Sequence, residues 1–129
     1  MSTPLAFTDA SLAVPWLPGT EAVQMVADGG VLIDLRSLRE VAATGIAQGA
    51  MHIPMPEFGA AATPGDPAFV PALRDGRPVI LYCATGVRSQ IAGGFLMSLG
   101  HPAVWNLGGL REWIDGGGAL RRSHTHSRW

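Results

Sequence analysis

The chain has 129 residues, of which 47% are hydrophobic and 15% are charged, and its formal net charge at pH 7 is −1. This length suits a single domain with its own core, and the small net charge excludes a general attraction to nucleic acids or anionic membranes. All basic residues are arginine and one cysteine is present, which excludes lysine Schiff bases, internal disulfides and multi-thiolate zinc sites.

The first part of the chain predicts an irregular segment, then a helix and a strand. Residues 1–19 contain three prolines and no sustained periodicity, so we expect an irregular lead-in that packs through Trp16. Thr20 is expected to cap a helix over residues 21–27. The apolar run at residues 31–35 predicts a buried strand.

The middle of the chain predicts short elements. Residues 36–43 are expected to form a short helix, and residues 50–54 a short extended segment. Residues 54–67 form a Pro/Gly-rich stretch to which no element is assigned. A further helix is expected over residues 68–74.

A third strand is predicted at residues 78–82, because this run is apolar, β-branched and aromatic. It is followed by Cys83 and by a helical apolar stripe over residues 90–99, which stops at Gly100.

The last part of the chain predicts a strand at residues 103–106, a turn at 108–109 and a helix over 110–114 with Trp113 facing inward. Strands that alternate with helices predict an α/β fold, with a central, mainly parallel sheet that carries helices on both faces. We expect one domain over residues 20–120, followed by a flexible tail at 121–129.

Targeting signals are not expected. The first basic residue is Arg36, and Asp9 interrupts the apolar start of the chain, which argues against a signal peptide and for a cytoplasmic protein. The longest uncharged run, residues 89–110, is broken by glycines and a proline, so no membrane span is expected. The low charge content favours a monomer or a weak homodimer, and no cofactor, metal or nucleic acid is expected.

Cys83 is the candidate reactive residue. It follows a predicted parallel strand, and ligands of α/β sheets bind at the carboxyl ends of such strands. Backbone amides of residues 84–88 can form an anion-binding nest around the sulfur, and the positive end of the next helix points the same way. Together with the guanidinium of Arg88, these groups favour the thiolate over the thiol.

Four segments together resemble the rhodanese family of sulfurtransferases. Residues 32–36 with Glu40 are similar to the opening signature of that family, and residues 49–54 to its second signature. Residues 83–89 resemble its active loop, and residues 106–113 its closing strand, glycine pair and tryptophan. The resemblance implies a rhodanese-like fold for this chain.

The resemblance also implies a reaction. In that family the cysteine takes sulfane sulfur from a donor such as thiosulfate, becomes a persulfide, and passes the sulfur to cyanide or a thiol. The donor here is expected to be a small molecule or a protein. Cys83 is then the catalytic residue, and Arg36 and Arg88 are expected to bind the anionic substrate. The loop residues expected to stabilise the persulfide are Ala84, Thr85, Gly86, Val87, Arg88 and Ser89.

Some roles stay open at this point. Arg36 either binds substrate or forms an ion pair with Glu40 at helical spacing. Asp34 and Glu40 are interpreted as structural residues near the site. Ser89 either donates its hydroxyl to the sulfur or caps the following helix, and capping is the favoured interpretation.

Two other functions are weighed against sulfur transfer. One is a rhodanese-like binding or sensing module without turnover. The other is a cysteine phosphatase or arsenate reductase, whose loops space cysteine and arginine one residue further apart than Cys83 and Arg88. The shorter loop favours a single sulfur atom over a tetrahedral phosphate. Because Ala84, Thr85 and Val87 are uncharged, we expect only modest activity with thiosulfate.

Overall fold

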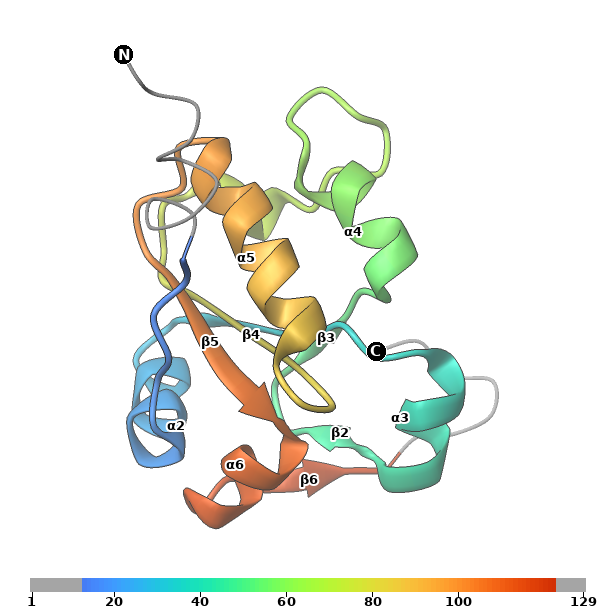
Figure 1. Ribbon diagram of the computed structural model, residues 1–129, viewed down its shortest axis with the longest axis vertical. Coiled ribbons are helices and arrows are strands. Elements are labelled where there is room, and N and C mark those ends of the chain that lie inside the picture. The colour runs from blue at the N-terminus through green and yellow to red at the C-terminus, as the bar shows by residue number, and fades with distance from the viewer. Residues whose placement is uncertain (1–12, 123–129) are drawn as a thin grey trace.

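The structure is a computed structural model that describes residues 13–122. Residues 1–12 of the predicted lead-in and 123–129 of the predicted tail lie outside the described residues. A parallel sheet forms the centre of the fold (Figure 1). Its strands are, in spatial order, β3 (Met51–His52), β1 (Val31–Asp34), β4 (Val79–Cys83) and β5 (Val104–Gly109).

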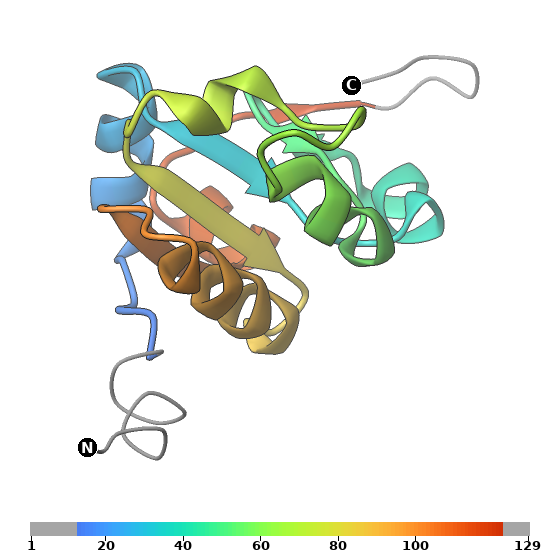
Figure 2. The ribbon, with the colours of Figure 1, turned by 90° about the horizontal axis from the view of Figure 1, so that it is seen from above.

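Helices cover both faces of this sheet, which confirms the predicted fold class. The helices are α2 (Gly19–Ala27), α3 (Leu38–Thr44), α4 (Met55–Ala62), α5 (Val87–Ser98) and α6 (Leu110–Asp115), with a short 3-10 helix η2 (Pro71–Arg74). Buried residues of α4, α5 and η2 pack on one face, and those of α2, α3 and α6 on the other (Figure 2). Within residues 13–122, none of these helices is long and apolar enough to cross a membrane.

The two central strands are buried on both faces, as their continuous apolar runs predict. Ile33 and Leu81 point to the side of α4 and α5, while Leu32 and Ile80 point to the side of α2 and α6. All four side chains are at most 1% exposed. β1 and β4 pair in parallel, so both strands deliver their next residues to the same edge of the sheet.

A second, antiparallel sheet of two short strands corrects the predicted tail boundary. Strand β2 (Ile46–Ala47) pairs with β6 (Leu120–Arg121), and Ile46 lies opposite Arg121. Arg121 therefore belongs to the folded domain and not to a flexible tail. Strand β6 forms because β2 is buried and its backbone N–H and C=O groups need hydrogen-bond partners. The polar and basic sequence around Arg121 does not indicate this pairing.

Residues 13–18 of the lead-in pack against the sheet. Trp16 pairs in parallel with Asn106 at the outer edge of β5, where Leu17 N–H donates to the Asn106 carbonyl at 2.9 Å. Val14 and Leu17 are buried. Residues 13–18 thus add to the edge of the sheet. The sequence does not indicate a strand there, because Pro15 and Pro18 interrupt the alternation of apolar and polar residues.

Helix boundaries differ from the predicted ones where caps and prolines decide them. Thr20 does not cap α2, because the helix begins at Gly19 after Pro18. Helix α4 occupies part of the Pro/Gly-rich stretch: its prolines lie at the N-terminal end, where the missing N–H costs no hydrogen bond, and Phe58 is buried. The helix predicted at residues 68–74 is reduced to η2.

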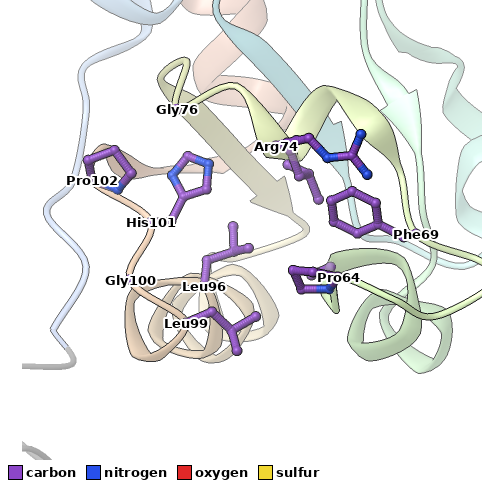
Figure 3. A pocket seen from close by; sticks show the side chains of 11 residues that line it. Pro64, Phe69, Arg74, Gly76, Leu96, Leu99, Gly100, His101 and Pro102 are labelled. Carbon is purple, nitrogen blue, oxygen red and sulfur yellow. The ribbon is translucent and has the colours of Figure 1, made fainter.

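A cavity of about 240 Å³ lies at the amino-terminal edge of the sheet, away from Cys83 (Figure 3). His101 and the side chains of Phe69, Leu96 and Leu99 are among the residues that line it. Both ring nitrogens of His101 are buried, and neither has a hydrogen-bond partner in the described part of the chain. Burial lowers the pKa of His101, since the charged imidazolium is poorly solvated there.

Replacing His101 by leucine is expected to raise the free energy of unfolding by about 1–3 kcal/mol, because the substitution removes buried polar atoms without partners. The folded-state pKa of His101 lies below its unfolded value, so the wild type loses stability as the pH falls below about 6.5. The variant should lose this part of the pH dependence. Urea denaturation between pH 7 and pH 5 measures both effects.

His52→Leu is the matched control for this experiment. The His52 Nε2 atom lies 2.7 Å from the Arg36 carbonyl oxygen, so its loss should lower stability. A destabilised His101→Leu variant would contradict the interpretation of His101 as an unpaired buried group.

Candidate active site

Cys83 lies at the carboxyl end of β4, with its side chain 1% exposed. The Gly86 N–H donates a hydrogen bond to Cys83 Sγ at 3.0 Å. Gly86 adopts φ +100°, a conformation that favours glycine, and this turn brings the chain back to begin α5 at Val87. The predicted curl of the loop around the sulfur is thereby present.

Its surroundings lower the pKa of Cys83 below the ordinary value of a cysteine. Burial alone raises the pKa, since it disfavours the charged thiolate. The Ser89 hydroxyl and the backbone N–H groups of Ser89, Gly86 and Thr85 act in the opposite direction and outweigh burial. Of the six predicted loop residues, these three therefore lower the pKa of Cys83, and Arg88 also interacts with the sulfur, since Glu40 and then Cys83 raise the pKa of Arg88. The result is a thiol poised to ionise.

Ser89 does not cap α5, which corrects the favoured interpretation from the sequence. The N-cap position is Gly86, and Ser89 lies fully buried within the first turn of the helix. Its Oγ atom lies 3.6 Å from Cys83 Sγ. The hydroxyl donates to Asn106 Oδ1 at 2.7 Å, so Ser89 links the sulfur to strand β5.

Asn106 holds the loop in place, a role that the sequence did not reveal. Its Nδ2 group donates to the Gly86 carbonyl and to Gln90 Oε1, both at 3.0 Å. Its Oδ1 atom accepts from the Gly108 N–H at 2.9 Å. Asn106 is fully buried. A polar residue inside a buried strand was the available signal, because such groups stay buried only when they are hydrogen-bonded.

The loop is also packed tightly on both sides. A Cβ atom on Gly86 would come within 2.4 Å of the Trp16 ring, and one on Gly109 within 2.3 Å of the Ala84 carbonyl oxygen. Trp16, although 59% exposed, therefore covers the turn that presents Gly86 N–H to the sulfur. The predicted packing role of Trp16 is confirmed.

Arg88 forms a bidentate ion pair with Glu40. The Nη1 and Nη2 atoms of Arg88 lie 2.8 Å and 3.0 Å from the two carboxylate oxygens. The hydrogen bonds from Arg88 lower the pKa of Glu40 to about 2, so the carboxylate is ionised at neutral pH. Glu40 also completes a capping box with Ser37 at the start of α3. The pair ties the cysteine loop to α3, and its two side chains are 33% and 35% exposed.

Arg36 pairs with Asp34 rather than with Glu40. The Asp34 carboxylate accepts from Arg36 Nε at 3.1 Å and from Nη2 at 2.8 Å, while Arg36 also donates to Thr44 Oγ1 and the Gly45 carbonyl. Arg36 is 4% exposed and Asp34 is fully buried. Through the bonds of Arg36 to Thr44 and Gly45, the pair connects β1 to the end of α3. Substrate binding by Arg36 stays a prediction.

A groove of about 600 Å³ opens beside Cys83. The residues that line it come from the segment between β1 and α3, from α3, the cysteine loop, α6 and β6, which Figure 1 shows gathered around the carboxyl edge of the sheet. They are Arg36, Glu40, Ala43, Thr44, Cys83, Ala84, Leu110, Arg111, Ile114 and Leu120. Within the described residues, no three His, Cys, Asp or Glu side chains gather in a group that could hold a metal ion.

Comparisons with known proteins agree with this fold. The model of the rhodanese-like domain family matches residues 19–115. The comparison with curated proteins gave no match. Among solved structures, a Rhodopseudomonas palustris protein of unknown function, described as a possible tyrosine phosphatase, is 23% identical, with a TM-score of 0.76. The match covers 94% of this chain and 96% of that chain, and at this identity it shows the fold alone.

Two sulfurtransferases are also among the similar structures. A human single-domain sulfurtransferase is 29% identical over 79% of this chain and 96% of its own, with a TM-score of 0.64. A thiosulfate sulfurtransferase from Pseudomonas aeruginosa is 29% identical over 87% of this chain, with a TM-score of 0.66. This second match covers 21% of the Pseudomonas chain, so the present chain corresponds to one part of that protein.

Proposed function

Because the chain belongs to the rhodanese-like domain family, we propose that it is a sulfurtransferase that carries sulfane sulfur as a persulfide on Cys83. The observation that carries the proposal is the set of backbone N–H groups around the sulfur, with Gly86 N–H at 3.0 Å from Sγ. These groups stabilise a negative charge on sulfur without any proton transfer. The lowered pKa of Cys83 supplies the thiolate that attacks the donor.

The proposed reaction consists of two successive nucleophilic displacements on sulfur. The Cys83 thiolate attacks the outer sulfur of thiosulfate, the sulfur–sulfur bond of the donor breaks, and sulfite leaves with the bonding electron pair. Cyanide or a thiolate then attacks the outer sulfur of the persulfide. The bond between the two sulfur atoms breaks, thiocyanate or a new persulfide leaves, and the Cys83 thiolate is restored.

A free reactive thiol persists in a reducing compartment, which supports a cytoplasmic place of work. The proposed partners are a small-molecule or protein sulfur donor and a cyanide or thiol acceptor. We propose that the protein acts as a monomer or weak homodimer, without nucleic acid, membrane or cofactor.

A phosphatase is the second candidate, since one similar structure is described as a possible tyrosine phosphatase. Such an enzyme needs a general acid near the leaving group. Both carboxylate oxygens of Asp34 accept hydrogen bonds from Arg36, and the residue is fully buried, so Asp34 does not suit that role. The four residues between Cys83 and Arg88 also favour sulfur over phosphate.

Intact-mass measurement after treatment with thiosulfate tests the proposal. The wild type should gain one sulfur atom and should release thiocyanate when cyanide is added. A protein that gains no sulfur from thiosulfate or from a low-molecular-weight persulfide would indicate a binding module instead. Hydrolysis of an aryl phosphate without sulfur transfer would establish the phosphatase.

A further inference from the structure

Two arginines line the groove beside Cys83, Arg36 and Arg111, and within residues 13–122 Arg111 is the one without an ion pair. Arg36 is paired with Asp34, and Arg88 with Glu40. Arg111 also lines the groove, is exposed, and has no ion pair or hydrogen bond with any residue in the described part of the chain. A positive charge in this position is available to a ligand that occupies the groove.

Besides Glu40 and Thr44, the rest of the groove wall is largely apolar, and two of its large apolar side chains are exposed. Ile114 is 43% exposed and Leu120 is 40% exposed, and Leu110 and Ala43 also line the groove. Residues three and four apart share one face of a helix, so α6 presents Leu110 and Arg111 together with Ile114. Large apolar side chains left in water at a binding site are stabilised when a ligand covers them.

The apolar part of the wall does not match a small doubly charged donor. Thiosulfate is compact and strongly hydrated, so it would pair with Arg111 but would leave Ile114 and Leu120 exposed. A groove of about 600 Å³ falls within the range of 300–1,000 Å³ that is common for small-molecule sites. It therefore has room for a longer molecule whose middle is apolar.

We propose that the sulfur acceptor is a low-molecular-weight thiol with an apolar arm that ends in a carboxylate. This proposal rests on the proposed sulfurtransferase function. The acceptor thiolate attacks the outer sulfur of the Cys83 persulfide, the arm covers Ile114 and Leu120, and the carboxylate pairs with Arg111. The bond between the persulfide sulfurs breaks, the acceptor departs as a persulfide, and Cys83 is restored as a thiolate.

Matched acceptors test the role of the charge. The persulfide form of the protein is offered ω-mercaptohexanoate, the uncharged ω-mercaptohexanol or the cationic ω-aminohexanethiol, and release of sulfur is followed over a range of acceptor concentrations. The wild type should show a KM about tenfold lower for mercaptohexanoate than for mercaptohexanol, with similar kcat. Arg111→Gln should remove the difference, and Arg111→Glu should favour the amine.

Arg39→Gln is the matched control, because Arg39 is an exposed arginine of α3 that does not line the groove. It should leave both the carboxylate preference and the turnover with cyanide unchanged. A carboxylate preference that survives Arg111→Gln, or its absence from the wild type, would overturn the proposal while cyanide turnover keeps the sulfurtransferase function intact.

Binding without reaction separates the groove from the chemistry. The unreactive methylthiohexanoate should bind the Cys83→Ser variant in a calorimetric titration, and the added Arg111→Gln substitution should weaken binding by about tenfold. Equal affinity for methylthiohexanol would overturn the assignment of Arg111. If the wild type never carries sulfur, the sulfurtransferase function fails, and with it the acceptor proposal, whatever the titration shows.

Discussion

Sulfur transfer is expected to fall by about a thousandfold or more when Cys83 is replaced by serine. The hydroxyl is not ionised at neutral pH and cannot form a persulfide, so the first displacement is lost. The fold should remain, since serine fits the same space and its Oγ atom can still accept from the Gly86 N–H. Thiocyanate formation measures the loss, and thermal unfolding shows that the protein is still folded.

Thr85→Ser is the matched control for this experiment, because it changes a side chain of the same loop and keeps the backbone N–H that acts on the sulfur. It should retain most of the activity. Wild-type rates in the Cys83→Ser variant would show that sulfur is transferred without the thiol, and the persulfide mechanism would then be wrong.

The free energy of unfolding is expected to fall by about 3–5 kcal/mol in Asp34→Asn. The substitution leaves the buried guanidinium of Arg36 without its opposite charge, and an amide cannot replace both carboxylate oxygens as acceptors. The effect is large because both side chains are at most 5% exposed. Urea denaturation at pH 7 measures it.

Asp75→Asn provides the contrast. Asp75 also pairs with an arginine two residues away, Arg77, but at 3.5 Å and with side chains 55% and 45% exposed. Exposed pairs contribute little, so a change below about 1 kcal/mol is expected. Similar losses in the two variants would show that burial does not decide the strength of the Asp34 pair.

Most of the sheet could be predicted because its strands are buried on both faces. Residues 31–35, apolar apart from Asp34, and residues 78–82 each overlap a strand of the structure, β1 (Val31–Asp34) and β4 (Val79–Cys83). The short elements could not be predicted in the same way. Arg121 and Trp16 pair with neighbours far away in the sequence, and their own sequence contexts are basic or proline-rich.

The place of Cys83 at the end of a strand and before a tight turn could be predicted, but its partners could not. Cys83 is identified by its place after a strand and before a glycine turn. The spacing of Arg36 and Glu40 predicted an alternative helical pair, yet Arg36 lies before the helix, and Glu40 pairs with Arg88 across 48 positions. Such long-range pairs depend on which strands are neighbours in the sheet. The spacing of residues along one helix contains no information on strand order.

The groove beside Cys83 could not be predicted from the sequence either, because its walls come from elements that are far apart along the chain. Arg111 follows a glycine pair at the start of a short helix, and nothing in that context points to Cys83. The two come together because β4 and β5 are neighbours and because β6 returns to β2 beside α3. Only the assembled edge of the sheet shows that Arg111 and Cys83 line one groove.

The contact of Trp16 with the cysteine loop couples two parts of the chain thermodynamically. Asn106 hydrogen-bonds both to the lead-in, through Leu17 N–H, and to the loop, through the Gly86 carbonyl. Packing of the lead-in against β5 and the arrangement of backbone N–H groups around Cys83 Sγ therefore favour each other, and such linkage is reciprocal. Whatever stabilises sulfur on Cys83 also holds the lead-in against β5, so loading with sulfur should slow hydrogen exchange at Leu17.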